Sequence, residues 1–433
     1  MQTKGYKTFK FIETLGGIAL YVHKKNGLRV LIWEDHSTPV VALNVTYLVG
    51  SRNEAVGHTG ATHLLEHLMF KGSKKFNKKT GKPIDQIVFG MGAKANATTW
   101  NDRTNYWELL PSERLPELMA VEADRMRGAI LDEQDRASEM TVVRNEFERH
   151  ENEPAEVLDK EIWASAFREH PYHHPTIGWK SDVENMSIER LRAFYNDFYW
   201  PNNAYLVLAG DVGAGEALDL AEKYFGKIKS APKAIPDMYT TEPPQEGERR
   251  VNVRRSGEIP IVSIAHKIPA ALHEDSKALE VLANVLGKGK SSRLYRAMVD
   301  KALVSSIATS AGAFRDGGLL VTTAHLVPTS VPAEIEAMII SEYEKIKKAG
   351  ITKEELDREI YNAKVFHAFA SDGPLGIALL LNEATSLGDW RLLPNYSKQI
   401  SGVTLEKVKA VANAYLQSDY ATVGHFCPKR VTN

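Results

Sequence analysis

The order of strand-like and helix-like segments recurs on the two sides of a proline-rich stretch, and this recurrence limits the folds open to the chain. The stretch is residues 229–248, KSAPKAIPDMYTTEPPQEGE, where four prolines and scattered charges interrupt helical and alternating patterns alike. Each side carries strands, then a helix, then a hairpin. We infer an internal duplication, with a coincidence between generic patterns as the alternative.

Apolar and alternating runs predict the elements of each side. Before the linker, the strands are GIALYVHK, GLRVLIWE and PVVALNVTYLVG, the helix is GATHLLEHLMFKG, and the hairpin joins AKANATT to TNYWELLP. After it, the corresponding segments are VNVRRS, IPIVSIAHKIP, the helix EDSKALEVLANVLGKG, and a hairpin of LVSSIATSAGAF and GGLLVTTAHLVP. The first side also predicts helices over 111–129, 132–170 and 213–227, with a buried strand at NNAYLVLAGD.

We therefore predict an α+β fold of two duplicated units, each a mainly antiparallel sheet covered by helices. The predicted domains are an N-terminal repeat over 1–230, a linker over 231–248 and a C-terminal repeat over 249–433. Aligning Pro39 with Pro260 brings the two helices opposite each other, and the second helix lacks the histidines of the first.

Composition excludes several classes of protein. Hydrophobic residues make up 43% and charged residues 25% of the 433 residues, with a formal net charge of -1, so neither a disordered chain nor a nucleic-acid-binding one is indicated. The single cysteine, Cys427, cannot form an internal disulfide, so a metal would take nitrogen and oxygen ligands. No apolar run reaches the roughly 18 residues of a membrane span.

The segment THLLEHLMFKG carries the residues that first suggest chemistry. His63 and His67 are four positions apart, so on a helix both imidazoles can reach one divalent ion, with Glu66 beside them. Ordinary helix residues with the same letters are the alternative. Because a catalytic zinc usually takes three protein ligands and a water, a third ligand is required.

The predicted helix over 132–170 offers two candidates for that ligand. Glu139 and Glu146 lie seven residues apart, two helical turns, and therefore share a face. Val142 and Val143 lie between them, as in a helix packed against a core. From spacing alone, solvated glutamates on a charged helix are an equally good interpretation.

These motifs resemble the inverzincin metallopeptidases of the pitrilysin and insulinase type, in particular the half-length members that include bacterial zinc peptidases and the mitochondrial processing peptidase. The inverted motif is His63 to His67 within GHTGATHLLEHLMFKGS. The similarity continues through NATTWNDRTNYWELLP, VVRNEFERHENEP, HPYHHPTIGWKSDVENMS and FYWPNNAYLVLAGD, which together cover the first half. The second half matches more loosely.

The resemblance implies a role for each residue of the motif. His63, His67 and Glu146 would bind zinc, Glu66 would be the base that takes a proton from the attacking water, and Glu139 would support the site. It also implies that peptides add as a strand along KANATTW, at Asn96, Ala97 and Thr98. An ordinary hairpin strand is the alternative for that segment.

One feature of the family is missing from the second half. Self-sufficient members carry an arginine and a tyrosine, seven residues apart, that donate to the substrate carbonyl. Val299 and Ser306 occupy those positions here, unless the alignment slips onto Arg293, Tyr295 or Arg296. We therefore expect a zinc endopeptidase that cuts peptides or unfolded segments inside a clamshell chamber of two chains, with a paralogous subunit supplying the Arg/Tyr pair.

Two alternatives to this function stay open: a non-catalytic binding or scaffold subunit, and a homodimeric peptidase. We expect a periplasmic protein whose leader is absent from this chain, with the cytoplasm as the alternative. His266 and the cluster of His170, His173 and His174 are expected to be structural rather than a second metal site.

Overall fold

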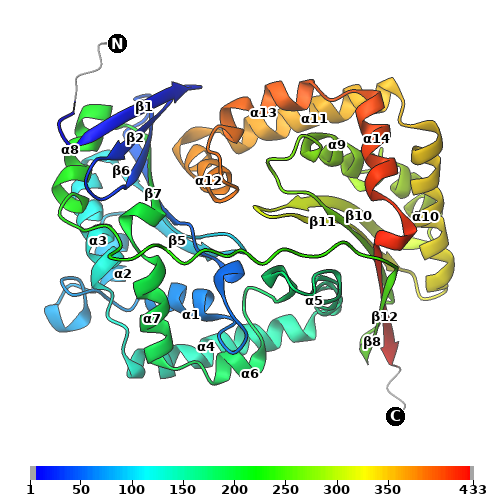
Figure 1. Cartoon of the computed structure of the whole chain (residues 1–433), viewed down its shortest axis with the longest axis horizontal. Helices are drawn as coiled ribbons and strands as arrows, with labels where there is room; N and C mark the ends of the chain where they lie inside the picture. The colour runs from blue at the N-terminus through cyan, green and yellow to red at the C-terminus, as the bar shows by residue number, and fades with distance from the viewer. Residues whose placement is uncertain (1–5, 430–433) are drawn as a thin grey trace. The chain divides into compact units, whose positions relative to one another are not determined.

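The computed structural model describes residues 6–429, and these form two compact units. Unit 1 comprises the described residues within Met1–Asn145, Pro175–Tyr239 and Ala368–Asn395. Unit 2 comprises those within Glu146–His174, Thr240–His367 and Tyr396–Asn433. Each unit is a sheet with helices packed on it (Figure 1), so the predicted α+β class is confirmed.

Unit 1 is built on a seven-stranded sheet in the order β1-β2-β3-β7-β4-β6-β5. β3 and β7 are parallel, and every other neighbouring pair in this sheet is antiparallel. The hairpin predicted from AKANATT and TNYWELLP is β5 and β6. The strands are β1 Phe9–Leu15, β2 Ile18–His23, β3 Arg29–Glu34, β4 Val40–Tyr47, β5 Lys94–Thr99, β6 Thr104–Pro111 and β7 Ala204–Gly210.

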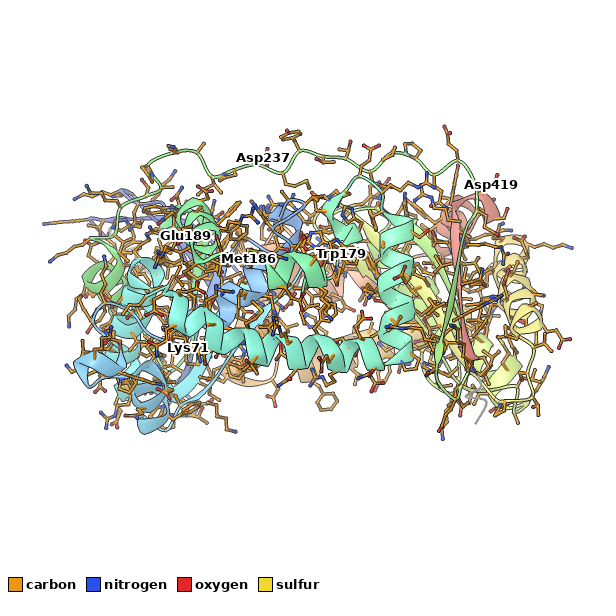
Figure 2. The ribbon with its side chains drawn as sticks, turned by 90° about the horizontal axis from the view of Figure 1, so that it is seen from below. Lys71, Trp179, Met186, Glu189, Asp237 and Asp419 are labelled. Atoms are coloured by element: carbon orange, nitrogen blue, oxygen red, sulfur yellow. The ribbon has the colours of Figure 1, made fainter. Side chains whose placement is uncertain are left out.

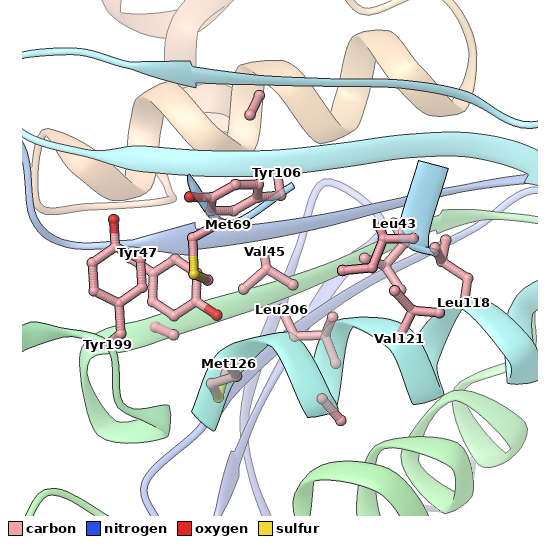
Figure 3. Close-up of a cluster of buried hydrophobic side chains, with 14 of the residues drawn as sticks. Leu43, Val45, Tyr47, Met69, Tyr106, Leu118, Val121, Met126, Tyr199 and Leu206 are labelled. Carbon is pink, nitrogen blue, oxygen red and sulfur yellow. The ribbon is translucent and has the colours of Figure 1, made fainter. Parts of the chain in front are cut away.

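Helices cover both faces of this sheet because successive side chains of a strand point to opposite sides. Leu43 and Val45 of β4 and Leu206 of β7 pack with Leu118 and Val121 of α3 in the core of one face (Figure 3). The other face packs against α12. The helices of unit 1 are α1 Ala61–Leu68, α2 Ile84–Gly90, α3 Leu115–Gly128, α6 Lys180–Glu184, α7 Ile188–Phe198, α8 Ala214–Phe225 and α12 Gly373–Ser386.

Unit 2 repeats this plan with five strands in the order β10-β11-β9-β12-β8. Its parallel pair is β8 and β12, so the order and directions match β5-β6-β4-β7-β3 of unit 1, which confirms the inferred duplication. The strands are β8 Arg249–Ser256, β9 Ile261–Ile268, β10 Val304–Ala313, β11 Gly318–Leu326 and β12 Ala421–Lys429. The helices that lie wholly or mainly in unit 2 are α5 Pro154–Ala166, α9 Ser276–Gly287, α10 Pro332–Ala349, α11 Lys353–Ala370 and α14 Leu405–Tyr415. The boundary between the units falls inside α13 Leu392–Ser401.

The compact units differ from contiguous halves of the chain in two segments. Glu146–His174 precedes the linker but belongs to unit 2, and Ala368–Asn395 follows it but belongs to unit 1. The reason is packing: α5 contributes Leu158 and Ile162 to the core around β9 and β12, and α12 covers β4 and β7. The domain division 1–230, 231–248 and 249–433 therefore remains a prediction about the sequence repeats.

The helix predicted over 132–170 is two helices, α4 Glu133–Asn152 and α5. Pro154 has no N–H and stands in the first turn of α5, where none is needed, so the chain turns at Glu153. In the described part of the chain, no helix is long and apolar enough to span a membrane.

Candidate metal centre

Helix α1 presents one apolar and one polar face. Leu64, Leu65 and Leu68 are buried in the core of unit 1, at the spacing of a single helical stripe. His63, Glu66 and His67 occupy the remaining face and are partly exposed. The apolar stripe of THLLEHL thus fixes the direction in which the two imidazoles and the carboxylate point.

Two carboxylates hold the chain that leads into α1. Glu54 accepts hydrogen bonds from the backbone N–H of Gly60 (2.8 Å) and of Thr62 (2.7 Å), at the start of the helix. Asp182 accepts from the backbone N–H and the hydroxyl of Thr59, the latter at 2.7 Å. Burial raises the pKa of Glu54 to about 8, although the hydrogen bonds from Thr62 and Gly60 oppose that rise.

A group of three side chains that could bind a metal ion lies at this face. One ligand atom each from His63, His67 and Glu146 falls within 4.8 Å of the other two. Among residues 6–429 no other group of three or more histidine, cysteine, aspartate or glutamate side chains meets this criterion. The boundary between the units falls inside α4, so Glu146 counts with unit 2 although it continues the helix that carries Glu139.

This donor set fits zinc. Two imidazole nitrogens and one carboxylate oxygen are a usual set of protein ligands for a catalytic zinc, which keeps its fourth position for water. Ligand atoms about 2.1 Å from one ion lie roughly 3.4 Å apart in a tetrahedron, so small side-chain rotations would bring the three atoms into range. Rotations of that size are available to partly exposed side chains.

Glu139 is placed to orient one of the imidazoles. The Nδ1 of His67 donates a hydrogen bond to the Glu139 carboxylate at 3.1 Å, which leaves Nε2 of His67 for a metal. Lys71 forms an ion pair with the same carboxylate, and Figure 2 shows Lys71 beside the long helix α4. Glu139 is 7% exposed, so Lys71 and His67, rather than water, surround its carboxylate.

Glu66 stands beside the three candidate ligands but is outside that group. Its carboxylate accepts a hydrogen bond of 2.6 Å from the hydroxyl of Thr99, the last residue of β5. Sequence reasoning missed Thr99, although alternation along β5 signals it, since Ala95, Ala97 and Thr99 share one face of that strand.

Strand β5 lies at the edge of the unit 1 sheet and pairs with β6 alone among the described strands. Of the three predicted substrate residues, Asn96 and Thr98 are exposed and Ala97 is buried. The N–H of Ala97 donates to the side-chain oxygen of Asn96 at 2.9 Å. The N–H of Ala97, on the edge strand, therefore has a side-chain acceptor that the carbonyl of a bound peptide could replace.

The positions that the alignment predicts for the Arg/Tyr pair, Val299 and Ser306, lie in unit 2. Val299 ends the π-helical segment Tyr295–Val299 and packs partly buried on the unit 2 core. Ser306 is exposed in β10, next to a break in its register with β11. The guanidinium of Arg293, one of the alternatives, donates to the Glu355 carboxylate at 2.8 and 2.6 Å.

The other histidines do not form a second metal group within residues 6–429. His170 Nε2 lies 3.3 Å from a carboxylate oxygen of Asp316. His266 is buried in unit 2, where desolvation lowers its pKa to about 4 and keeps the ring neutral near pH 7.

Comparison with known proteins places these features in a family. The description "Insulinase (Peptidase family M16)" matches residues 29–180, and "Peptidase M16 inactive domain" matches residues 185–362. The zinc protease PqqE of Helicobacter pylori is 33% identical over 403 residues, covering 92% of this chain and 90% of its own. The uncharacterized zinc protease YmxG of Bacillus subtilis is 25% identical over 400 residues, covering 92% and 95%.

Solved structures share the fold. A protease from Helicobacter pylori superposes with a TM-score of 0.89 at 31% identity, over 97% of this chain and 99% of its own. The periplasmic protease PqqL of Escherichia coli gives a TM-score of 0.76 at 18% identity, and the match covers 98% of this chain but 48% of PqqL.

Proposed function

Because the chain belongs to the insulinase family of peptidases, family M16, we propose that it is a zinc-dependent endopeptidase acting on peptides or unfolded segments. The observation that carries the proposal is the approach of His63, His67 and Glu146 to one another, with Glu66 beside them and outside the group. The names of the relatives, which call them zinc proteases, support the same metal and reaction.

Each residue of the centre has a distinct part in the proposed reaction. His63, His67 and Glu146 would hold the zinc, which when bound lowers the pKa of water and polarises a carbonyl. The Glu66 carboxylate accepts the proton of the attacking water, and Thr99 fixes that carboxylate by its hydrogen bond. Glu139 holds the His67 ring in the tautomer with Nε2 available.

The substrate is proposed to bind along β5 as an added strand. Main-chain hydrogen bonds recognise a peptide with little regard to its side chains, which suits an enzyme for varied segments. A peptide carbonyl would take the place of the Asn96 side-chain oxygen on the N–H of Ala97. Asn96, Ala97 and Thr98 are thus the proposed contact residues.

We further propose that a paralogous chain completes the chamber and supplies the Arg/Tyr pair. Support comes from the predicted alignment, which places Val299 and Ser306, neither an arginine nor a tyrosine, at the two positions. Support also comes from PqqL, of which this chain matches about half, and from the solved first half of PqqL, 93% of which this chain covers. PqqL is described as periplasmic, in keeping with our proposal of the same compartment.

Two substitutions test the proposal. Glu66→Gln removes the proton acceptor and keeps the shape of the side chain, so zinc content should stay near one per chain. Peptide hydrolysis by the complex of this chain with the paralogous subunit, the active complex, should fall at least about 10²-fold. His67→Ala removes a ligand and should empty the site, as measured by metal analysis. Hydrolysis by Glu66→Gln within a few-fold of the parent, or full zinc in His67→Ala, would contradict the assignment. A parent without zinc would favour the non-catalytic alternative.

A further inference from the structure

A closed ring of hydrogen-bonded side chains in unit 1 links the β5-β6 hairpin to helix α12. Asn105 donates to Asn44 at 2.6 Å, Asn44 to Thr46 at 2.8 Å, and Thr46 to Asn382 at 2.8 Å. Glu383 accepts from Asn382 at 3.1 Å and from Nη2 of Arg103 at 2.5 Å. Arg103 closes the ring by donating to Asn105 at 2.9 Å.

Arg103 connects this ring to strand β5. Its Nη1 donates to the backbone carbonyl of Thr98 at 3.0 Å and to the Thr98 hydroxyl at 2.5 Å. The Thr98 hydroxyl in turn donates to Asn105 at 2.6 Å. Thr98 is one of the three residues at the proposed substrate edge, so Arg103 holds both its main chain and its side chain.

The ring is buried where it meets the sheet and exposed at its charged end. Asn44, Thr46 and Asn105 are fully buried, and Arg103 is 8% exposed. A buried guanidinium needs a counter-charge, and Glu383 provides it from a side chain that is 49% exposed. Because every ring member has a partner, the network is rigid, and loss of the Glu383 charge would leave Arg103 without its carboxylate.

We propose that Arg103 and Glu383 are positioning residues that hold β5 ready for an incoming peptide, so that helix α12 helps to set substrate affinity. This inference rests on the proposed function and adds to it residues outside the metal centre. A β5 strand that fluctuates must be ordered when peptide binds, which weakens binding. Arg103 anchors Thr98, whereas Thr99, the last residue of β5, is the residue that contacts Glu66. We therefore expect substrate affinity to change more than the chemical step.

The test compares Glu383→Gln with Glu383→Asp, which keeps the charge. The matched control is Glu117→Gln, which removes an exposed ion pair of 2.9 Å with Arg114 elsewhere in unit 1. In the complex of this chain with the paralogous subunit, Glu383→Gln should raise KM about tenfold and lower kcat by less than that. The reason is that a peptide would contact β5 directly, whereas Glu66 contacts only Thr99 at the end of the strand. Glu383→Asp should restore most of the affinity, zinc content should be parental in all three variants, and the control should match the parent.

Hydrogen exchange separates positioning from a general loss of stability. In Glu383→Gln the amides of residues 94–99 should exchange faster while those of 61–68 stay unchanged. An unchanged KM with unchanged exchange in β5 would overturn the inference, and so would faster exchange throughout unit 1. Should Glu383→Gln not fold, Arg103→Lys tests the same link in another way, because it keeps the charge but loses the planar fork that reaches Thr98 and Glu383 together. It should raise KM and speed exchange in β5 in the same direction. A parent without zinc-dependent hydrolysis would refute the proposed function, and exchange would still decide the role of the ring.

Discussion

At the scale of single residues, the hydroxyl of Thr99 holds the carboxylate of Glu66, the proposed general base. Thr99→Val keeps the shape and removes the 2.6 Å donor to Glu66. A hydrogen bond to a charged group contributes about 1.5–3 kcal/mol, so kcat of the active complex should fall at least about tenfold with KM and zinc content unchanged. Steady-state kinetics checks this, and Thr99→Ser, which restores the hydroxyl, is the control. Parental kcat in Thr99→Val would contradict the role.

His266 makes a prediction about acid stability. Burial lowers its folded pKa to about 4 from 6.5, so between those values the unfolded chain binds the proton and the folded chain does not. Stability from this residue is therefore present above pH 6.5 and is lost as the pH falls to 4, by about 3 kcal/mol. In denaturant titrations across this range, His266→Gln should have a smaller loss than the parent. Equal losses in the two proteins would show that His266 does not titrate as inferred.

Some residues of the candidate metal centre could be predicted from local sequence spacing and others could not, for physical reasons. The helical spacing of His63 and His67 places both imidazoles on one face, and that inference needs only local geometry. Glu139 and Glu146 could not be separated from solvated glutamates by spacing, because their surroundings depend on α1, far away in the sequence. Thr99 escaped notice because its partner, Glu66, is reached only when β5 lies beside α1.

At the scale of elements, the turn after Tyr295–Val299 carries local strain. Ala302 is the single non-glycine residue with positive φ in the described chain, at 54°. The N–H groups of Ala302 and Leu303 bond back to Val299 and Met298, as in a helix C-terminal motif that favours glycine. Ala302→Gly should stabilise the protein by about 1 kcal/mol, measured from denaturant midpoints. Ala297→Gly, at a right-handed helical position, should destabilise it instead; a lower midpoint for Ala302→Gly would refute the strain.

Most elements could be predicted because their apolar periodicity is local. The hairpin of β5 and β6 and the strands on both sides of the linker have the predicted order. No element was predicted after Pro328, where α10 to α14 and β12 lie. β1 was also not predicted, because Phe11 and Ile12 stand next to each other at a break in the register with β2, which interrupts the alternation of the strand. The apolar residues of α12 indicate that the helix is buried on one side, but they do not identify β4 and β7 as the strands that it packs against.

At the scale of the whole molecule, the proposed absence of the Arg/Tyr pair predicts that activity needs a second, different chain. The pure protein should bind zinc and cleave peptides poorly, because the loss of a single donor of this kind costs about 10²-fold to 10³-fold. Addition of the paralogous subunit should restore cleavage. Peptide turnover by each chain and by their mixture tests this, with complex formation followed by size exclusion. Full activity of this chain alone would contradict the positions given to Val299 and Ser306.

The crossing of segments between the units also constrains how this chain can be divided or shortened. A protease that nicks the linker would not release two independent domains, because each fragment would keep a helix that belongs to the other unit's sheet. A fragment ending before the linker would lack α12 and leave apolar side chains of β4 and β7 uncovered, a surface prone to aggregation. Gene truncations at the repeat boundary should therefore yield soluble protein only when both fragments are made together and can complement each other.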